Sequence, residues 1–73
     1  MREHLLEAEG VVIEHCRGGV FRVRIGSHIV VCRVASKLDR FKIKILRNDK
    51  VKVELAPPDY GRGRITYRMA VEE

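Results

Sequence analysis

Cationic side chains are the chemical groups that this sequence places most densely, and they fall into two sets. The first set lies between residues 33 and 47, where one acid, Asp39, accompanies six basic residues: Arg33, Lys37, Arg40, Lys42, Lys44 and Arg47. The second set lies near the end of the chain: Arg62, Arg64 and Arg68. Lysine supplies a point charge to a phosphate, whereas the planar arginine fork also hydrogen-bonds a base edge or stacks on a base. These residue types favour binding to a phosphate backbone, and RNA is the ligand that we expect.

Four aromatic side chains could add base stacking, which is worth roughly 1–3 kcal/mol per base. Phe41 lies within the first basic set and is therefore the best stacking candidate. Phe21 shares a predicted strand face with Val23, which favours a place in the core over a stacking role. Tyr67 follows Thr66 on a predicted strand, and the pattern leaves both roles open; Tyr60 lies in a predicted loop.

The sequence gives little support for a metal site, a catalytic site or a cofactor-binding site. His15-Cys16 and the pair His28 and Cys32 contain metal-binding residue types, but structural zinc sites use two closely spaced pairs, and C-x-x-C is absent. His15 and Cys16, as neighbours on a strand, would point to opposite faces. The sequence also has no G-x-S-x-G elbow, P-loop or dinucleotide fingerprint. We therefore predict no catalytic residues, no metal and no cofactor.

Length and charge set the scale of the protein. The 73 residues predict a single domain spanning 1–73, with flexible ends at 1–4 and 69–73. The net charge of +5 is concentrated in residues 37–68, which hold ten basic and four acidic side chains. A field of this kind is the expected footprint of a polyanion-binding surface. We expect a monomer without a membrane segment, located in the cytoplasm or in an organellar stroma or matrix, with Cys16 and Cys32 as reduced thiols.

Hydrophobic alternation predicts the elements that position these groups. Strands are expected at residues 9–15, with a bend or bulge at Gly10, and at 20–25, 28–34, 50–55 and 64–68. The third of these strands is apolar on both faces, so its core side stays open. Residues 35–47 lack alternation and predict a loop with a short helical turn, which Ile43, Ile45 and Leu46 would hold against the body.

Five short strands with a longer excursion between the third and fourth match the OB-fold, an all-β Greek-key barrel that binds oligonucleotides. An SH3-like barrel is the alternative, because the pattern separates the two poorly. In a five-stranded barrel, the loops after the third and fourth strands can lie close together. The two cationic sets would then merge into one surface.

The motifs also resemble a known family, bacterial translation initiation factor one, in order and nearly without gaps over residues 5 to 68. The matching motifs are Glu9-Gly10 with Val12, Phe21-Arg22-Val23, Lys37-Leu38, Ile43-Lys44-Ile45-Leu46, most of Asp49 to Leu55, and Asp59 followed by Gly63-Arg64-Ile65 and Tyr67-Arg68. The resemblance implies an S1-like OB-fold. It also implies binding at the A site of the small ribosomal subunit, on the ribosomal RNA and beside a ribosomal protein, in cooperation with initiation factors two and three.

Carried onto this sequence, the resemblance implies RNA contacts by Lys37, Arg40 and Lys44 in the loop and by Arg62, Arg64 and Arg68 near the end. From the residues themselves we add Phe41 and Lys42. One departure concerns the loop entry, where the family usually has Ser-Gly-Lys-Met-Arg-Lys and this chain places Asp39 at a basic position.

Two other functions are open to the sequence. A cold-shock-type chaperone for single-stranded RNA or DNA would use a similar barrel, but such proteins need a row of strand-borne aromatic residues. A protein-interaction module would bind its partner with little dependence on salt. A phosphate-binding protein instead predicts that log K falls with log salt, by about 0.7–0.9 per contact.

Overall fold

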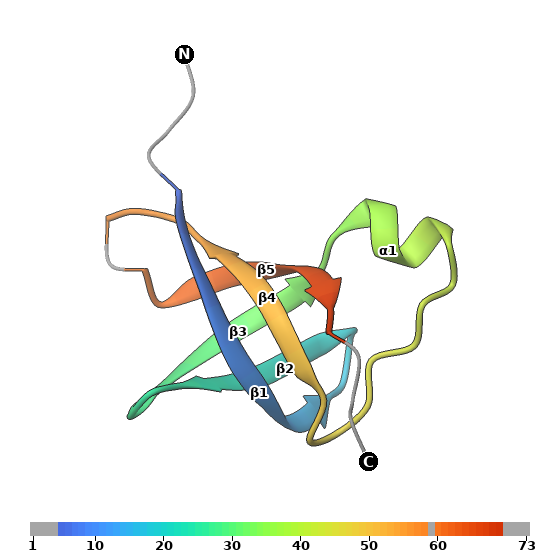
Figure 1. The fold of residues 1–73 in the computed structure, drawn as a ribbon, viewed down its shortest axis with the longest axis horizontal. Coiled ribbons are helices and arrows are strands. Elements are labelled where there is room, and N and C mark those ends of the chain that lie inside the picture. The colour runs from blue at the N-terminus through green and yellow to red at the C-terminus, as the bar shows by residue number, and fades with distance from the viewer. Residues whose placement is uncertain (1–4, 59, 70–73) are drawn as a thin grey trace.

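The computed structural model describes residues 5–58 and 60–69, which form five strands and one short helix (Figure 1). The elements in chain order are β1 (Leu6–Cys16), β2 (Val20–Ile25), β3 (His28–Val34), α1 (Ser36–Arg40), β4 (Lys50–Leu55) and β5 (Arg62–Arg68). The strands close into a barrel in the order β1-β2-β3-β5-β4. This closed barrel, with a helical turn between β3 and β4, confirms the predicted OB-fold over the SH3-like alternative.

Three strands have the predicted bounds, whereas β1 and β5 are longer. β1 begins at Leu6 rather than Glu9, because its first half pairs with β4 and its second half with β2. β5 begins at Arg62, which lies opposite Val31 in a parallel pairing with β3. Parallel pairing between distant segments leaves no local signal, so the sequence could not show where β5 begins.

Gly10 has a different role from the one predicted. The register of β1 against β2 shifts between Val12 and Glu14, so the irregularity does not fall at Gly10. Gly10 instead lies where β1 passes close over β2. A Cβ atom there would lie 2.6 Å from the carbonyl oxygen of Arg24 and 2.6 Å from Cγ1 of Val23. The position therefore requires glycine for close approach of the two strands.

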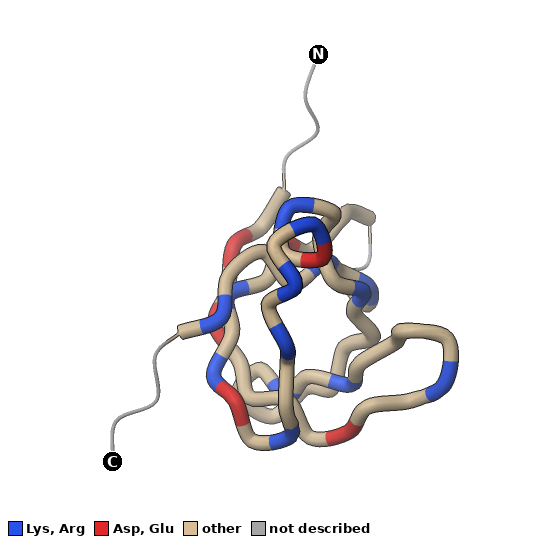
Figure 2. Tube along the Cα trace, turned by 90° about the vertical axis from the view of Figure 1, so that its right-hand side faces the viewer, with Lys and Arg blue, Asp and Glu red and all other residues tan. Residues whose placement is uncertain are grey.

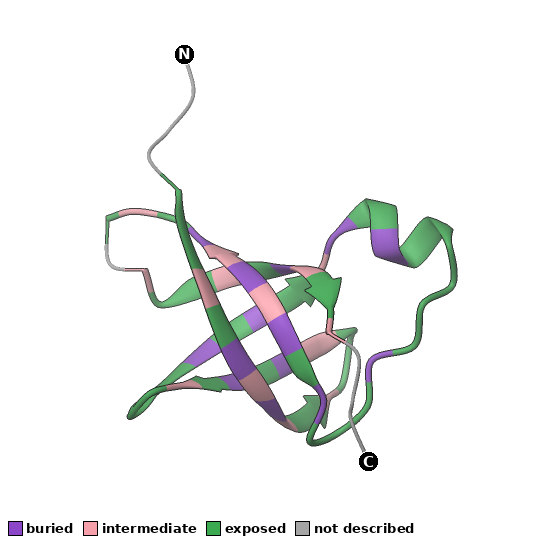
Figure 3. Ribbon diagram, in the orientation of Figure 1, coloured by how far each residue is buried: buried purple, intermediate pink, exposed green. Residues whose placement is uncertain are grey.

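Buried residues occur along every strand (Figure 3), and their mostly aliphatic side chains form the core. The buried cluster comprises Val12, Phe21, Val23, Val30, Cys32, Leu38, Ile45, Val51, Val53, Leu55 and Ile65. This resolves the open question of β3, whose Val30 and Cys32 point inward while Ile29 and Val31 remain exposed. Cys16 and Cys32 are free thiols, and burial raises the pKa of Cys32 to about 11. At neutral pH Cys32 is therefore a neutral, core-packing side chain.

Helix α1 lies at one end of the barrel (Figure 1). The backbone N–H of Ala35 donates a hydrogen bond to the carbonyl oxygen of Ile65 at 2.9 Å, and Leu38 places its side chain in the core. Of the three apolar residues predicted to hold the following segment, Ile45 is buried, but Ile43 and Leu46 are exposed. The segment is therefore held at fewer points than its composition indicated.

The predicted flexible ends mostly lie outside the described residues, which begin at residue 5 and end at residue 69. Met69, the last described residue, donates a backbone hydrogen bond to the carbonyl oxygen of Lys50 at 2.9 Å. The chain is thus still paired with β4 one residue beyond β5.

Candidate nucleic-acid interface

The basic segment, residues 36–48 between β3 and β4, includes α1 and is held to the barrel at both of its ends. At its start, α1 buries Leu38, and at its end the N–H of Asn48 donates to the carbonyl oxygen of Val12 at 2.7 Å. Between these points the backbone takes positive φ angles at Lys42 (58°) and Asn48 (75°). These two left-handed residues redirect the chain without a regular element. Between them Ile45 is buried, while the other side chains are exposed.

Asp49 fixes the end of this segment. Its buried carboxylate accepts hydrogen bonds from the backbone N–H of Leu46 and from Nε of Arg68, each at 2.8 Å. Burial opposes ionisation of the carboxyl, but the hydrogen bonds and the guanidinium charge outweigh it and lower the pKa of Asp49. The carboxylate thereby joins the basic segment to the end of β5.

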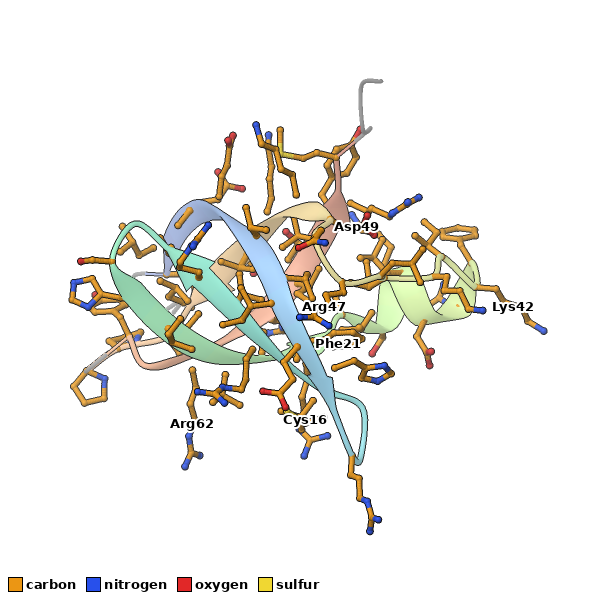
Figure 4. All side chains as sticks on the ribbon, turned by 90° about the horizontal axis from the view of Figure 1, so that it is seen from below. Cys16, Phe21, Lys42, Arg47, Asp49 and Arg62 are labelled. Carbon is orange, nitrogen blue, oxygen red and sulfur yellow. The ribbon has the colours of Figure 1, made fainter. Side chains whose placement is uncertain are left out.

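The predicted cations of the segment project away from the barrel. Figure 2 shows Lys and Arg recurring along α1 and the chain after it, and Lys42 points away from the body in Figure 4. The exposed residues are Lys37, Arg40, Lys42 and Lys44. Within residues 5–58 and 60–69, the ion pairs are Arg22–Glu14 at 3.0 Å and Arg68–Asp49 at 2.8 Å. All four cations are therefore available to a phosphate.

The late cationic set does not merge with the first through adjacent loops. The loop after β4 lies at the end of the barrel opposite α1, so Arg62 and Lys42 are far apart (Figures 1 and 4). β5 itself runs between the two ends, from Arg62 through Arg64 to Arg68. Arg68, predicted as an RNA contact, lies beside the basic segment but already donates its Nε to Asp49.

The outer face of three adjacent strands carries cations that the sequence analysis did not include among the predicted contacts. The register places Val31 of β3 opposite both Arg22 and Arg62, and Arg33 opposite Arg64. The face formed by β2, β3 and β5 therefore presents five arginines: Arg22, Arg24, Arg33, Arg62 and Arg64. Alternation along β2 does put its arginines outside, but only the parallel pairing of β3 with β5 reveals that they share a face with the late set.

The aromatic residues divide between core and surface. Phe21 is buried and its ring stacks on His15, with centroids 4.2 Å apart, as its strand face indicated. Phe41, at the end of α1, is 67% exposed. Tyr67 is 56% exposed, and Nζ of Lys52 lies 5.8 Å from its ring centroid. Two rings are thus open to stacking.

An open groove of about 370 Å³ lies between the turn after β1 and the basic segment. Arg33 and Lys44 both line it. Asp39, the acidic residue at a position where the family is usually basic, lines the same groove. Nη1 of Arg33 donates to the carbonyl oxygen of Gly18 at 3.0 Å, which holds the Arg33 side chain against the turn after β1. The geometry can receive a phosphate or the edge of a nucleotide.

Other site types have no counterpart in the part of the chain that the structure describes. Those residues contain no group of three or more His, Cys, Asp or Glu side chains that could hold a metal ion. No helix among them is long and apolar enough to cross a membrane.

A closed barrel of this order, with a helix between β3 and β4 and a cationic outer surface, defines an OB-fold protein. No model of a known protein family matches the chain. Among solved structures, it is similar to translation initiation factor one from the Wolbachia endosymbiont strain TRS of Brugia malayi, with 35% sequence identity and a TM-score of 0.74. The match covers 90% of this chain and 79% of that one. The chain therefore belongs to the family of translation initiation factor one.

A second similarity concerns the fold alone. YjeQ from Thermotoga maritima matches with a TM-score of 0.72 and 21% identity, over 89% of this chain and 23% of that protein. The same fold thus occurs as one part of a longer chain.

Proposed function

We propose that this protein is a non-enzymatic translation initiation factor that binds the A site of the small ribosomal subunit. Membership of the initiation factor one family supports this role. The contacts that we propose are electrostatic, from cationic side chains to phosphates of the ribosomal RNA. The bound protein would lie beside a ribosomal protein and cooperate with initiation factors two and three.

The observation that carries the proposal is the exposure of cations without acidic partners around α1. Lys37, Lys42 and Lys44 are exposed, and neither of the ion pairs in the described ranges involves them. Exposed lysines without acidic partners can neutralise nucleic-acid phosphates and release the counterions condensed on them. Arg40 would extend this surface, and Phe41 would stack on an unpaired base.

The arginine face formed by β2, β3 and β5 would supply the remaining contacts. Arg62 and Arg64 belong to the predicted set, and their neighbours across the strands are Val31 and Arg33. Arg68 has a different role in this proposal, because its Nε is engaged by Asp49. It would hold the basic segment in place and offer only its remaining guanidinium nitrogens to RNA.

The test is binding to purified small ribosomal subunits over a salt series, with chemical footprinting of the ribosomal RNA. The double variant Lys37→Ala/Lys44→Ala should weaken binding and reduce the slope of log K against log salt by about 1.5. The charge-matched control is Lys50→Ala/Lys52→Ala, which removes two lysines from β4. It should change the slope much less.

Protection confined to the A-site decoding region, and lost in the first variant, would support the proposal. Diffuse protection that free single-stranded RNA competes away would instead indicate a cold-shock-type chaperone. Binding that is insensitive to salt and to both variants would contradict phosphate recognition and indicate a protein-interaction module.

A further inference from the structure

His15, near the end of β1, is a titratable side chain that the proposed function does not use. Its imidazole ring lies flat on the ring of Phe21, with centroids 4.2 Å apart and an interplanar angle of 8°. Phe21 is buried and His15 is exposed, so the imidazole forms the outer layer of this stack. Stacking therefore fixes the plane of the imidazole while the side chain stays accessible to a ligand.

The imidazole lines the groove of about 370 Å³ that lies between the turn after β1 and the basic segment. Within residues 5–58 and 60–69, no hydrogen bond or ion pair involves the ring nitrogens of His15. A ligand in the groove can therefore accept a hydrogen bond from the imidazole without breaking a polar contact between described residues.

The charged groups that line the groove together with His15 come from three other parts of the chain. They are Arg33 from β3, Asp39 from α1 and Lys44 from the chain after α1. Glu14 and Cys16, the neighbours of His15 on β1, alternate to the opposite face, where Glu14 pairs with Arg22 at 3.0 Å. Arg17 is exposed in the turn after β1 and does not line the groove. The lining thus combines two permanent cations, one carboxylate and one imidazole.

A phosphate in this groove would bind the protonated form of the imidazole more tightly than the neutral form. The negative charge attracts the imidazolium and accepts a charge-assisted hydrogen bond from it. The Phe21 ring beneath the imidazole accommodates the charged form, because aromatic faces attract cations within about 6 Å of the ring centroid. Since the coupling between two ligands is reciprocal, phosphate binding then promotes binding of the proton.

We propose that His15 is a pH-dependent phosphate contact of the RNA-binding surface. Its protonated imidazole donates a hydrogen bond to a phosphate that Arg33 and Lys44 also contact. The proton comes from solvent, and because the charge of histidine changes between about pH 5 and 8, RNA affinity rises as the pH falls through this range. This inference rests on the proposed function and adds to it one contact residue and a dependence on pH.

The test is affinity for purified small ribosomal subunits at about pH 6 and about pH 8, at constant ionic strength. The unaltered protein should bind about threefold to tenfold more tightly at the lower pH than His15→Gln does, and the two proteins should bind alike at the higher pH. His15→Gln keeps a polar side chain that does not titrate. His28→Gln removes an exposed histidine at the start of β3, outside the groove, and is the matched control. It should retain the pH dependence of the unaltered protein.

His15→Phe separates the charge of the side chain from its ring. This variant keeps an aromatic ring on Phe21 but has no ring nitrogen, so it should keep the melting temperature and follow the pH profile of His15→Gln. If either variant shows the same pH dependence as the unaltered protein, the proposal is wrong. Uniform weakening of His15→Gln at both pH values is such a case, and it would assign His15 a role in packing or in stacking on a base.

A second measurement separates this inference from the proposed function. NMR signals of the His15 ring, recorded over the same pH range with and without a short oligouridine, report its protonation directly. The oligonucleotide should extend the protonated form to higher pH, and an unchanged titration would overturn the inference whether or not subunits bind. Failure of the protein to bind subunits, with the effect of RNA on His15 intact, would instead contradict the A-site function alone.

Discussion

The carboxylate of Asp49 accepts a hydrogen bond from Nε of Arg68 at 2.8 Å, and its side chain is only 7% exposed. The same oxygen atom, Oδ2, also accepts from the backbone N–H of Leu46. One buried atom therefore connects the end of β5 to the last part of the basic segment. In its absence the N–H of Leu46 would lose its acceptor, and the segment would be held by fewer contacts, among them the buried Ile45 and the hydrogen bond from Asn48 to Val12.

We expect Asp49→Ala to lower the free energy of unfolding by about 1.5–3 kcal/mol, because a partly buried donor and a guanidinium both lose a charged acceptor. Urea denaturation monitored by circular dichroism would measure the change. Asp39→Ala removes an exposed carboxylate from the same region and serves as the control. Equal stability of the two variants would show that the Asp49 link contributes nothing.

The same link predicts a dependence of stability on acid pH. The pKa of Asp49 is lowered from its ordinary value of 3.8, so the folded state binds this proton more weakly than the unfolded state. The stabilisation is therefore complete above pH 3.8 and disappears as the pH falls through the lower folded-state value. Unfolding free energies measured on both sides of this pH should fall less steeply in Asp49→Asn than in the unaltered protein. Parallel pH profiles would count against the assignment.

Phe41 should contribute to RNA binding and not to stability, because its ring is 67% exposed. Phe41→Ala should weaken subunit binding by about 1–3 kcal/mol through loss of stacking. Phe41→Tyr keeps a flat ring and should retain the affinity, and the melting temperature should not change in either variant. If Phe41→Leu binds as well as the unaltered protein, the contribution is apolar contact rather than stacking.

The strands could be predicted from the sequence because alternation is local. Phe21 and Val23 alternate with arginines along β2, and this period is sufficient to assign both the strand and its buried face. The cations of the basic segment can likewise be read from the sequence, since they lie close together along the chain. For the residues of β2 and for the cations of the basic segment, the local sequence is therefore enough to predict burial or exposure.

The relationships between distant segments could not be predicted. Arg33 and Arg64 share a face only because β3 pairs in parallel with β5, and Asp49 meets Arg68 only because β4 begins where the antiparallel β5 ends. The sequence therefore assigned Arg68 to RNA contact alone, although its Nε is bound within the protein. Contacts such as these depend on how the barrel closes, and barrel closure involves all the strands at once.

Gly10→Ala should destabilise the barrel, because the added methyl group would lie 2.6 Å from a backbone carbonyl oxygen of β2, which cannot move independently. The expected loss is about 1–3 kcal/mol, as for other overpacked sites. Thermal unfolding would measure it. Glu9→Ala, at the adjacent exposed position of β1, is the control and should have little effect. A stable Gly10→Ala protein would mean that β1 and β2 separate there without cost.

Asp39→Lys tests whether the acidic departure in the loop opposes phosphate binding. Asp39 lines the same groove as Arg33 and Lys44, so its charge weakens the field that those two cations present to a phosphate. Replacement by lysine should tighten subunit binding by about 0.2–1 kcal/mol at low salt. It should also steepen the salt dependence by about 0.7–0.9 if the lysine makes a new phosphate contact. Asp39→Asn should fall between the two proteins. Unchanged or weaker binding in the lysine variant would instead assign Asp39 a structural or specificity role, such as accepting a hydrogen bond from a base.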